Sequence, residues 1–499
     1  RKIKIVMKQL KQASALFLCL LLFSSCSNQV IGEQQAFNPN LTVGESKETA
    51  QISKIETLKL PANYADIAAS PWSCADLNNR KEAMLLFDSP VTLSPNFQAE
   101  PALVAVSGSG VDWVLTVQPE RYFSDGSALT ARDIDNSLSM ALEETSYYKN
   151  RLSNIKSHTV SGDTVKITLN QPDALFANLL TFPVAKQRGG EYIGTGKYVF
   201  DSKEGDSVTL TQNPSYWGKK PSVPAISLVS LPKEDIAAYS LKLGEIDCLY
   251  TEGAAEDARN LSAGDYPVIS NQLVFLGVNM NRENGKNASV RKAISLALDR
   301  KYLIQSSFSA SAVPAASVLH PNFMEKQTSV QRNLDTAKKL LAESGFSQSE
   351  PLSLTLLYCT DGADRAQTAN QIAAQLAEAG IRISLDGKPE KEYFSALASG
   401  NYDLYLGEIL LGDDMNFSHL FTKGDRYGYG VVPSEALMNA YQTAFSTGNG
   451  WDAFLKAFEA EYPIVPLAFR NATLSFSRKY SVNVTATASN LFYNIDSWQ

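Results

Sequence analysis

Hydrophobic and polar positions show their clearest pattern in the last third of the chain. Apolar residues alternate with their neighbours over 352–356 and again over 381–385, which predicts two strands. Between these strands, apolar positions recur at helical spacing over 369–376. A shorter helix over 393–397 then precedes an apolar strand at 402–411. Strands that alternate with helices imply right-handed crossovers and a mostly parallel, covered sheet, so the pattern predicts an α/β fold.

Helix-start signals occur in other parts of the chain. Thr130 is a candidate N-cap, and Asp133 three residues later is its capping-box partner. An amphipathic helix follows Ser289, and another is expected with Asp335 as its N-cap and Gly345 as its stop signal. The helical pattern therefore extends well beyond the region of the predicted sheet.

The first segment has a different character from the rest of the chain. Residues 1–25 carry five basic side chains and no acid, followed by an apolar run from Ala13 to Phe23 and then small residues. The run is shorter than the roughly 20 residues that span a bilayer, so we expect a secretory signal peptide rather than a membrane helix. Met7 precedes a well-formed signal by itself and is a possible true start.

Cys26 follows Leu-Phe-Ser-Ser, a sequence that resembles the bacterial lipobox, in which the Cys becomes the lipidated first residue. Phe23 stands where the usual pattern has Leu. We expect lipidation at Cys26; the alternative is an ordinary secretory signal in which this Cys has no role. Residues 26–52 are polar and aperiodic and are expected to tether the lipid to the folded body.

Composition limits the possible functions. The 499 residues carry a formal net charge of −7, which argues against nucleic acid as a partner. Three His residues are too few for several metal centres, and the cysteine spacing fits no metal motif, so no metal is expected. Apart from Cys26, the cysteines of the body are expected to be isolated buried thiols, and at most one disulfide can form among Cys74, Cys248 and Cys359.

Motifs of common enzyme classes are absent from the sequence. It contains neither a Gly-x-Ser-x-Gly elbow nor a His-Glu-x-x-His pair. Gly194-Thr195-Gly196-Lys197 has the wrong glycine spacing for a phosphate loop. We therefore expect no catalytic residue and no cofactor.

Seven short segments resemble, in family order, bacterial extracellular solute-binding proteins of family 5, the oligopeptide- and dipeptide-binding lipoproteins of ABC importers. They are Tyr122–Asp133, with Phe-Ser-Asp-Gly and Leu-Thr-Ala; Gly194–Tyr198; Asn213–Gly218, with Asn-Pro and Tyr-Trp-Gly; Leu243–Asp247; Val278–Asn281; Val290–Arg300; and Asp335–Gly345. Each motif is weak alone, but their common order over most of the chain is specific.

The resemblance implies a two-lobed fold of the periplasmic-binding-protein type II, with a ligand cleft between the lobes. Lobe I would comprise residues 53–269, with an extra subdomain at about 80–185. Lobe II would comprise residues 270–468, and residues 469–499 would return to lobe I. Connecting segments are expected near Leu273–Val278 and Ile464–Phe469, with Asn279 fixing a hinge hydrogen bond.

The resemblance also suggests a ligand site along the strand Tyr405–Leu411. An extended peptide would pair with exposed backbone there, and Gly407 would allow a close approach. Glu408 is difficult to bury alone, so it implies either a cationic ligand group or an internal Arg. Tyr405 belongs to the same expected surface.

The carboxylate that holds a peptide ammonium in this family has no clear match here. Asp413 and Asp414 lie just beyond the expected position, so either an adjacent Asp replaces it or the ligand lacks a free amine there. Two further loops would face the cleft. They contribute the candidate ligand-binding residues Trp72, Asp76, Tyr250 and Glu252, although Trp72 also fits packing within the lobe.

We therefore expect a monomeric, lipid-anchored receptor on the extracytoplasmic face of the cell membrane. It would capture a small solute, with a short peptide as the expected ligand, and deliver it to an ABC permease with its ATPase subunits. The alternatives are the same fold with a metal chelate or an oligosaccharide as ligand, a sensor lipoprotein, and a hydrolase of peptides or cell-wall fragments.

Overall fold

The computed structural model describes residues 54–231, 236–252, 264–308, 311–325, 327, 330–422, 428–477, 479–480 and 482–498. The described residues belong to one compact unit. The expected signal peptide, Cys26 and the tether at 26–52 lie outside the described residues.

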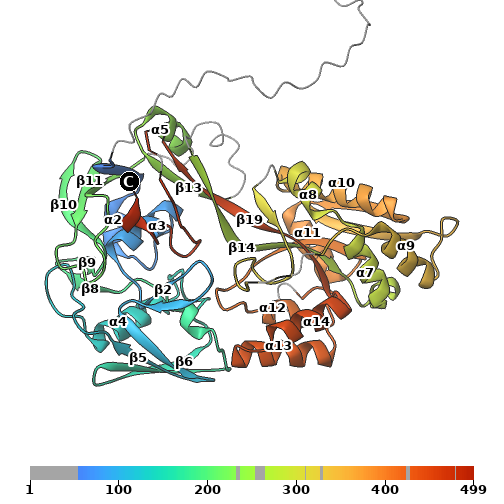
Figure 1. Ribbon diagram of the computed structural model, residues 1–499, viewed down its shortest axis with the longest axis horizontal. Helices are drawn as coiled ribbons and strands as arrows, with labels where there is room; N and C mark the ends of the chain where they lie inside the picture. Colours follow the sequence, from blue (N-terminus) through green and yellow to red (C-terminus); the bar gives the residue numbers. More distant parts are fainter. Residues whose placement is uncertain are drawn as a thin grey trace, which may run out of the picture. The chain divides into compact units, whose positions relative to one another are not determined.

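A four-stranded sheet begins the first lobe, in the order β1-β12-β11-β10. Its strands are β1 (Thr57–Pro61), β10 (Tyr198–Glu204), β11 (Ser207–Gln212) and β12 (Ala225–Val229). The helices α2 (Tyr64–Ala69), α3 (Leu77–Leu86) and α5 (Ala237–Leu243) belong to the same lobe. In Figure 1, α2 and α3 lie beside β10 and β11.

A second antiparallel sheet, in the order β4-β5-β7-β6, carries α4 (Ala131–Ala141). Its strands are β4 (Val104–Ser109), β5 (Asp112–Val117), β6 (Ile155–Ser161) and β7 (Thr164–Leu169). The predicted capping box is confirmed, because the Thr130 and Asp133 side chains each accept the other's backbone N–H. Two hairpins complete this part: β2 (Val91–Leu93) with β3 (Ala99–Pro101), and β8 (Ala185–Arg188) with β9 (Glu191–Gly194).

The largest sheet follows the order β13-β19-β14-β18-β16-β17, with β15 on β19. Its strands are β13 (Cys248–Glu252), β14 (Gly264–Val278), β15 (Ala312–Pro314), β16 (Leu352–Cys359), β17 (Ile381–Lys388), β18 (Leu404–Leu410) and β19 (Ile464–Phe476). The predicted strand-helix-strand-helix-strand unit is confirmed. β16 pairs in parallel with β17 and with β18, and α10 (Ala363–Glu378) and α11 (Glu390–Ser399) make the connections.

The other helices of the second lobe include both amphipathic helices expected from the sequence. They are α6 (Glu283–Lys286), α7 (Ala288–Ala297), α8 (Arg300–Ser307), α9 (Leu334–Glu343), α12 (Ser418–Phe421), α13 (Glu435–Thr447) and α14 (Trp451–Glu461). The expected N-cap Asp335 is wrong by two residues. Asn333 caps α9 by accepting the Thr336 N–H at 2.9 Å, and Asp335 lies in the first turn, where its charge favours the helix dipole.

The buried residues separate into cores that correspond to the two lobes. One large core contains side chains from residues 55–268 and from residues 472–498. Two further cores are built mainly from residues 273–469. Leu93 and Phe97 of the first lobe join one of the second-lobe cores, so the lobes also share apolar contact.

The strands β14 and β19 run through both lobes, as Figure 1 shows. Residues 264–269 of β14 pair with the first-lobe end of β19, and residues 273–277 pair with its second-lobe end. The register shifts between Ile269 and Leu273, which places the irregular crossing at residues 270–272. The connecting segments expected at 273–278 and 464–469 lie next to this crossing, within the second-lobe half of the strand pair.

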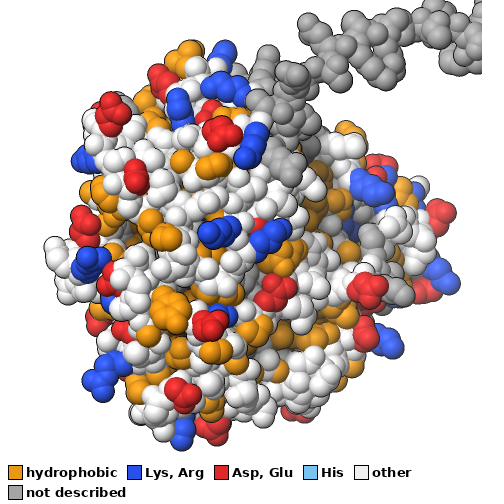
Figure 2. All heavy atoms as spheres, turned by 60° about the vertical axis from the view of Figure 1, so that its left-hand side comes forward, with side chains coloured by type: hydrophobic (Ala, Val, Ile, Leu, Met, Phe, Trp, Pro, Cys, Tyr) orange, Lys and Arg blue, Asp and Glu red, His pale blue; other side chains and the backbone are white. Residues whose placement is uncertain are grey.

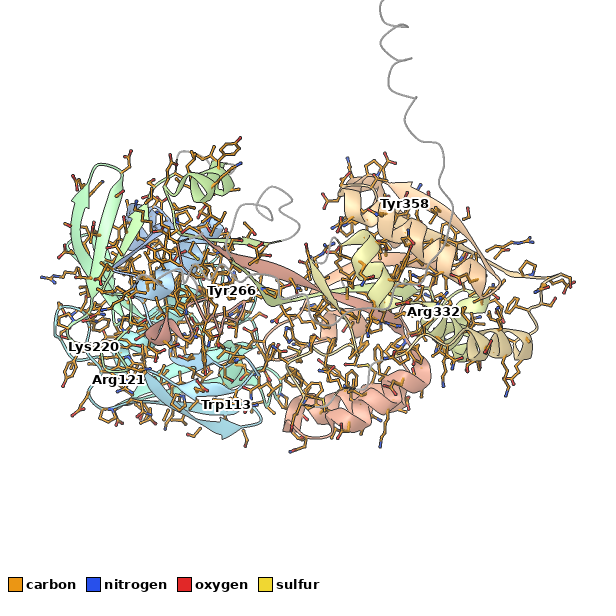
Figure 3. The ribbon with its side chains drawn as sticks, turned by 45° about the horizontal axis from the view of Figure 1, so that its top comes forward. Trp113, Arg121, Lys220, Tyr266, Arg332 and Tyr358 are labelled. Carbon is orange, nitrogen blue, oxygen red and sulfur yellow. The ribbon has the colours of Figure 1, made fainter. Side chains whose placement is uncertain are left out.

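The C-terminal segment packs in the first-lobe core. Trp498 is 1% exposed, and its ring lies 5.4 Å from Phe476 and 5.8 Å from Phe492. Tyr266 on β14, labelled in Figure 3, donates its hydroxyl to the Val482 carbonyl. The end of the chain is therefore fastened to the long strand that enters the second lobe.

The helices, the surface and the cysteines of the described residues each bear on the expectations from the sequence. Within the described ranges, no helix is both long and apolar enough to cross a bilayer. The face drawn in Figure 2 carries acidic and basic side chains interspersed with apolar ones. Cys74, Cys248 and Cys359 are buried free thiols, as the sequence led us to expect.

Replacement of Phe454 tests the aromatic core of the second lobe. This ring is 0% exposed and lies 5.9 Å from Phe417 and 5.6 Å from Tyr441. We expect Phe454→Ala to lower the free energy of unfolding by about 3–5 kcal/mol in urea titrations, because it leaves a cavity. The control Tyr302→Ala removes a ring that is 50% exposed, and its cost should stay within about 1 kcal/mol. Equal effects of the two variants would contradict the assigned core.

Candidate functional site

One edge of β18 is open beyond the first two residues of the strand. On one side β18 pairs with β14 along its whole length, from Leu404 to Leu410. On the other side β16 pairs only with Leu404 and Tyr405. From Leu406 onward, no strand in the described part of the chain continues this pairing.

The direction of the backbone groups at this edge follows from two hydrogen bonds. The Leu411 N–H donates to the Asn271 carbonyl oxygen at 3.0 Å, on the β14 side. The Leu406 carbonyl oxygen instead accepts the Tyr393 hydroxyl at 2.7 Å. Because backbone groups alternate along a strand, those of Leu406, Glu408 and Leu410 point away from β14. This edge can accept hydrogen bonds from an added strand and donate to it.

A pocket of about 90 Å³ lies beside this edge. It is lined by Phe275, Cys359, Arg365, Glu390, Tyr393, Phe394, Leu397, Tyr405, Leu406, Gly407, Glu408 and Tyr429. Aromatic rings make up much of the wall, and the Arg365 guanidinium, 33% exposed, supplies a positive charge. The pocket can therefore accept an apolar or planar group and hydrogen-bond an acceptor on it.

Tyr405 and Gly407 both line this pocket. The structure gives a different reason for a glycine at position 407 from the one expected. A Cβ atom on Gly407 would lie 2.7 Å from the Phe275 ring and 2.9 Å from the Tyr405 ring. Those two rings pack edge to face with centroids 5.7 Å apart. The expectation that Gly407 admits a ligand backbone is thus not supported, because aromatic side chains of the protein occupy the space over it.

Glu408 also lines the pocket, and its charge is balanced within the protein. Its carboxylate accepts two hydrogen bonds from Arg470, at 2.6 and 3.1 Å, and a third from Gln272 at 2.6 Å. Arg365 lies 3.6 Å away. Of the two explanations that the sequence left open for Glu408, the structure shows the internal Arg.

Arg470 joins Glu408 to a second carboxylate. Its Nη2 atom also donates to Asp364 at 2.7 Å. Burial by itself would lower the pKa of Arg470, but the hydrogen bonds and negative charges of Glu408 and Asp364 raise that pKa overall. Two guanidinium groups therefore face two carboxylates at this end of β18, and the group needs no external ion for balance.

Asp413 is occupied by protein groups and is not free to hold an ammonium. Its carboxylate accepts hydrogen bonds from Asn271 at 2.7 Å and Ser489 at 2.9 Å, and Arg151 lies 3.5 Å away. The side chain is 3% exposed. Because Arg151 and Ser489 belong to the first lobe and Asp413 to the second, this residue links the lobes.

Asp414 is likewise buried, at 5% exposure. One of its oxygens accepts the Asn416 N–H at 3.2 Å. Asp414 is not among the residues that line the pocket, and neither is Asp413. The structure therefore places neither of the two candidate aspartates at the open edge of β18.

Tyr250 and Glu252 lie together in the first lobe, apart from the pocket. The Tyr250 hydroxyl donates to Glu252 at 3.2 Å, and the Lys81 ammonium lies 5.0 Å over the Tyr250 ring. Burial lowers the pKa of Lys81 to about 8, and the Glu252 carboxylate opposes that shift. The Lys81 ammonium also donates to the Ala488 carbonyl, which fastens it to the C-terminal segment.

Trp72 and Asp76 take structural positions. Trp72 is 2% exposed, its indole N–H donates to the Pro183 carbonyl at 2.9 Å, and its ring meets Tyr192 edge to face. Asp76 is the N-cap of α3 and accepts the Asn79 N–H at 2.7 Å. Of the two roles considered for Trp72, the structure shows packing within the lobe.

Asn279 fixes a turn inside the second lobe. Its side-chain amide donates to the Gly400 and Tyr402 carbonyls, at 3.1 and 3.0 Å, and its N–H donates to Asp403. All three partners precede β18 in the same lobe. The strands cross between the lobes at residues 270–272, so these hydrogen bonds lie next to the expected connecting segment 273–278 but not at the crossing itself.

Comparisons with known proteins agree with this architecture. The family model for bacterial extracellular solute-binding proteins, family 5, matches residues 66–429. The chain belongs to this family. A curated relative, the glutathione-binding protein GsiB of Salmonella typhi, is 27% identical over 362 residues, covering 67% of this chain and 70% of its own.

Solved structures show the same fold at low identity. The ABC transporter substrate-binding protein CtaP from Listeria monocytogenes has a TM-score of 0.68 at 20% identity, covering 89% of this chain and 99% of its own. The nickel ABC transporter protein from Bacillus halodurans has a TM-score of 0.73 at 17% identity, covering 88% and 98%. At these identities the likeness establishes the family fold alone.

Several residues that line the pocket beside β18 were not among the candidate ligand-binding residues predicted from the sequence. Arg365 and Tyr393 lie at the beginning of helices that follow strands, where ligands commonly bind in parallel sheets. That rule could have found them, because the strand-helix-strand pattern was already evident. Tyr429 and Phe275 reach the pocket from distant positions in the sequence, and no local pattern reveals them.

Glu408→Gln tests whether the carboxylate serves the protein or a ligand. The substitution leaves Arg470 and Arg365 with Asp364 alone, so we expect the ligand-free protein to lose about 2–4 kcal/mol in free energy of unfolding, measured in urea. Glu390→Gln at the exposed rim should cost almost nothing. Arg470→Gln should cost less in the Glu408→Gln background than alone. Unchanged stability of Glu408→Gln would instead favour a ligand cation as its partner.

Proposed function

We propose that this protein is an extracytoplasmic solute-binding component of an ABC importer that binds a short peptide along β18. The single observation that carries the proposal is the open edge from Leu406 onward, with a small aromatic pocket beside it. An extended peptide can pair its backbone with this edge whatever its sequence, while one of its side chains enters the pocket.

Membership of family 5 supports a binding role over a catalytic one. GsiB is named for glutathione, which is a tripeptide, and its 27% identity to this chain exceeds the 17% of the nickel protein from Bacillus halodurans. The hydrogen-bonding groups at the pocket suit a peptide, because peptides offer both donors and acceptors. We propose that the ligand leaves unaltered and that the protein is not an enzyme.

The ligand proposed here need not present an ammonium to an aspartate. Asp413 is held by Asn271, Ser489 and Arg151, and Glu408 is paired with Arg470. Arg365 is the charged group that faces the pocket with donors to spare, since its contact with Glu408 is 3.6 Å long. A peptide with an acidic or carboxyl-terminal group at this position fits that arrangement.

The proposal includes attachment at the membrane. Residues 1–25 would be removed as a signal peptide, Cys26 would carry the lipid, and residues 26–52 would be the tether. The folded body would work as a monomer beside the permease and its ATPase subunits. The sequence pattern of residues 1–52 and the extracellular character of the family support this proposed attachment.

A nickel chelate is the second candidate ligand, because the Bacillus halodurans structure of the same fold is a nickel transporter protein. Among the described residues, no group of three or more His, Cys, Asp or Glu is arranged to hold a metal ion. A chelate would have to bring its own ligands to the metal and bind through its organic part.

Ligand identity is tested by thermal shift and by mass spectrometry of molecules carried through purification. We expect short peptides, glutathione among them, to raise the melting temperature. A peptide at about 100 times its Kd should add roughly 2.7 kcal/mol to the free energy of unfolding. A shift with a Ni–histidine complex and none with a tripeptide library would favour the second candidate and contradict the first.

Leu410→Pro tests the open edge itself. The Leu410 side chain is 72% exposed, and its N–H points away from β14, so the substitution removes one outward donor without breaking the β14 pairing. We expect peptide binding to weaken by about two- to tenfold, corresponding to one hydrogen bond. Leu410→Ala keeps the N–H and should bind as the unaltered protein does in calorimetry. Equal affinities of the two variants would show that a peptide does not pair there.

A further inference from the structure

A buried contact between the lobes lies away from the pocket. It joins residues 173–178 of the first lobe to residues 412–416 and α13 of the second. The Ala174 N–H donates to the Phe445 carbonyl at 2.9 Å, and the Asn178 amide donates to the Asp413 carbonyl at 3.1 Å. We call these two segments and their acidic side chains the interlobe acid cluster; the acids are Asp173, Asp413 and Asp414.

All three carboxyl groups of the cluster are removed from water. Asp173 is 0% exposed, Asp413 2% and Asp414 5%. One Asp173 oxygen accepts the Leu175 N–H at 2.8 Å, and the other, Oδ2, is buried without a hydrogen-bond partner. A buried carboxylate oxygen with no donor is costly, and a bound proton would give that oxygen a hydrogen to donate.

The positive charge near the cluster is too small for three carboxylates. Arg151 is the basic side chain in contact with it, at 3.5 Å from Asp413, and it also donates to Thr181 at 2.6 Å. Lys81 acts on Asp413 only through its longer-range charge and is bound to Ala488. His320 is near Asp413, but burial lowers its pKa to about 4, so it is neutral at physiological pH.

The remaining titratable neighbour comes from α13. The Tyr441 hydroxyl accepts the Phe417 N–H at 2.8 Å and donates to the Asn416 side chain at 3.1 Å, so its proton is already engaged. If all three acids were ionised, one guanidinium would face three negative charges in a buried space. Burial raises the pKa of both Asp173 and Asp414 above its ordinary value. Repulsion from Asp414 adds to the rise at Asp173, and repulsion from Asp413 adds to the rise at Asp414.

We infer that the interlobe acid cluster holds a bound proton, on the carboxyl group of Asp173 or of Asp414, and that loss of this proton loosens the contact between the lobes. The inference concerns the protein's own conformation and does not depend on the identity of the ligand. It adds a pH sensitivity to a protein whose proposed place is outside the cytoplasm, where pH varies with the surroundings.

The direction of the pH effect follows from the raised pKa. Where the lobes separate, the two carboxyl groups regain water and ionise near their ordinary pKa of about 4. The contact therefore binds protons more tightly than the separated state, and its stability falls as pH rises above that value. The loss continues until both groups are ionised in the contact as well, and it cannot exceed about tenfold per pH unit for each proton.

Hydrogen exchange of the backbone amides in 173–178 tests the inference directly, because the Ala174 N–H bridges the lobes. The full chain is followed by mass spectrometry between about pH 5 and pH 9, with rates corrected for the intrinsic pH dependence of exchange. We expect protection of this segment to fall as pH rises in the unaltered protein. In Asp173→Asn, whose amide is neutral at every pH, protection should stay nearly constant.

Asp163→Asn is the matched control, because Asp163 is an exposed residue of the same lobe; it should behave as the unaltered protein does. Asp414→Asn removes the other titratable carboxyl group, on the second-lobe side of the contact. It replaces Asp173→Asn in the experiment if that variant does not fold. Protection that is constant with pH in the unaltered protein would overturn the inference. So would a pH dependence that persists in both neutral variants.

Discussion

The pairing of β14 with β19 is the constraint on which the rest of the structure depends. In the described chain, this is the strand pair that enters both lobes, with a register shift where it crosses between them, and the core of each lobe packs on one end of it. The pair also fixes the position of β18, which lies against the second-lobe half of β14. A change in the register between the two long strands would therefore move the pocket and the crossing together.

Charge balance inside the second lobe decides which acids are available to a ligand. Glu408 and Asp364 are matched by Arg470 and Arg365, and Asp413 is matched by Arg151 of the first lobe. A buried carboxylate without a partner destabilises the folded protein strongly. Acids beside an apolar strand are therefore found paired with cations of the protein itself. The same reasoning explains why Asp173, which has no cation beside it, calls for a proton.

Local pattern was sufficient for most of the fold. The alternation in 352–356 and 381–385, and the helical spacing between them, predicted β16, α10 and β17 with their parallel pairing. The signals for the Thr130 capping box were equally local. The prediction of two lobes came from the order of the short family motifs, because hydrophobic periodicity alone does not define lobes.

The site was harder to predict, because its charges are paired over long distances in the sequence. Glu408 meets a residue 62 positions away, and Asp413 meets one from the C-terminal segment. Trp72 and Asp76 occur in a loop of the expected kind, yet the Trp72 indole donates to the distant Pro183 carbonyl and Asp76 caps the adjacent helix α3. Which polar residues remain for a ligand depends on these distant pairings, and no short window of sequence contains them.

The hydrogen bond from the Tyr393 hydroxyl to Leu406 has a consequence for how an incoming chain is aligned. This bond occupies the carbonyl oxygen of Leu406, the first residue of the open edge whose backbone points away from β14. The first residue whose outward N–H and carbonyl are both available to an added strand is therefore Glu408. Sliding that strand by one residue would turn every one of its side chains to the opposite face. In the proposed binding mode, the Tyr393 hydroxyl thus determines which side chains of a bound peptide face each side of the sheet.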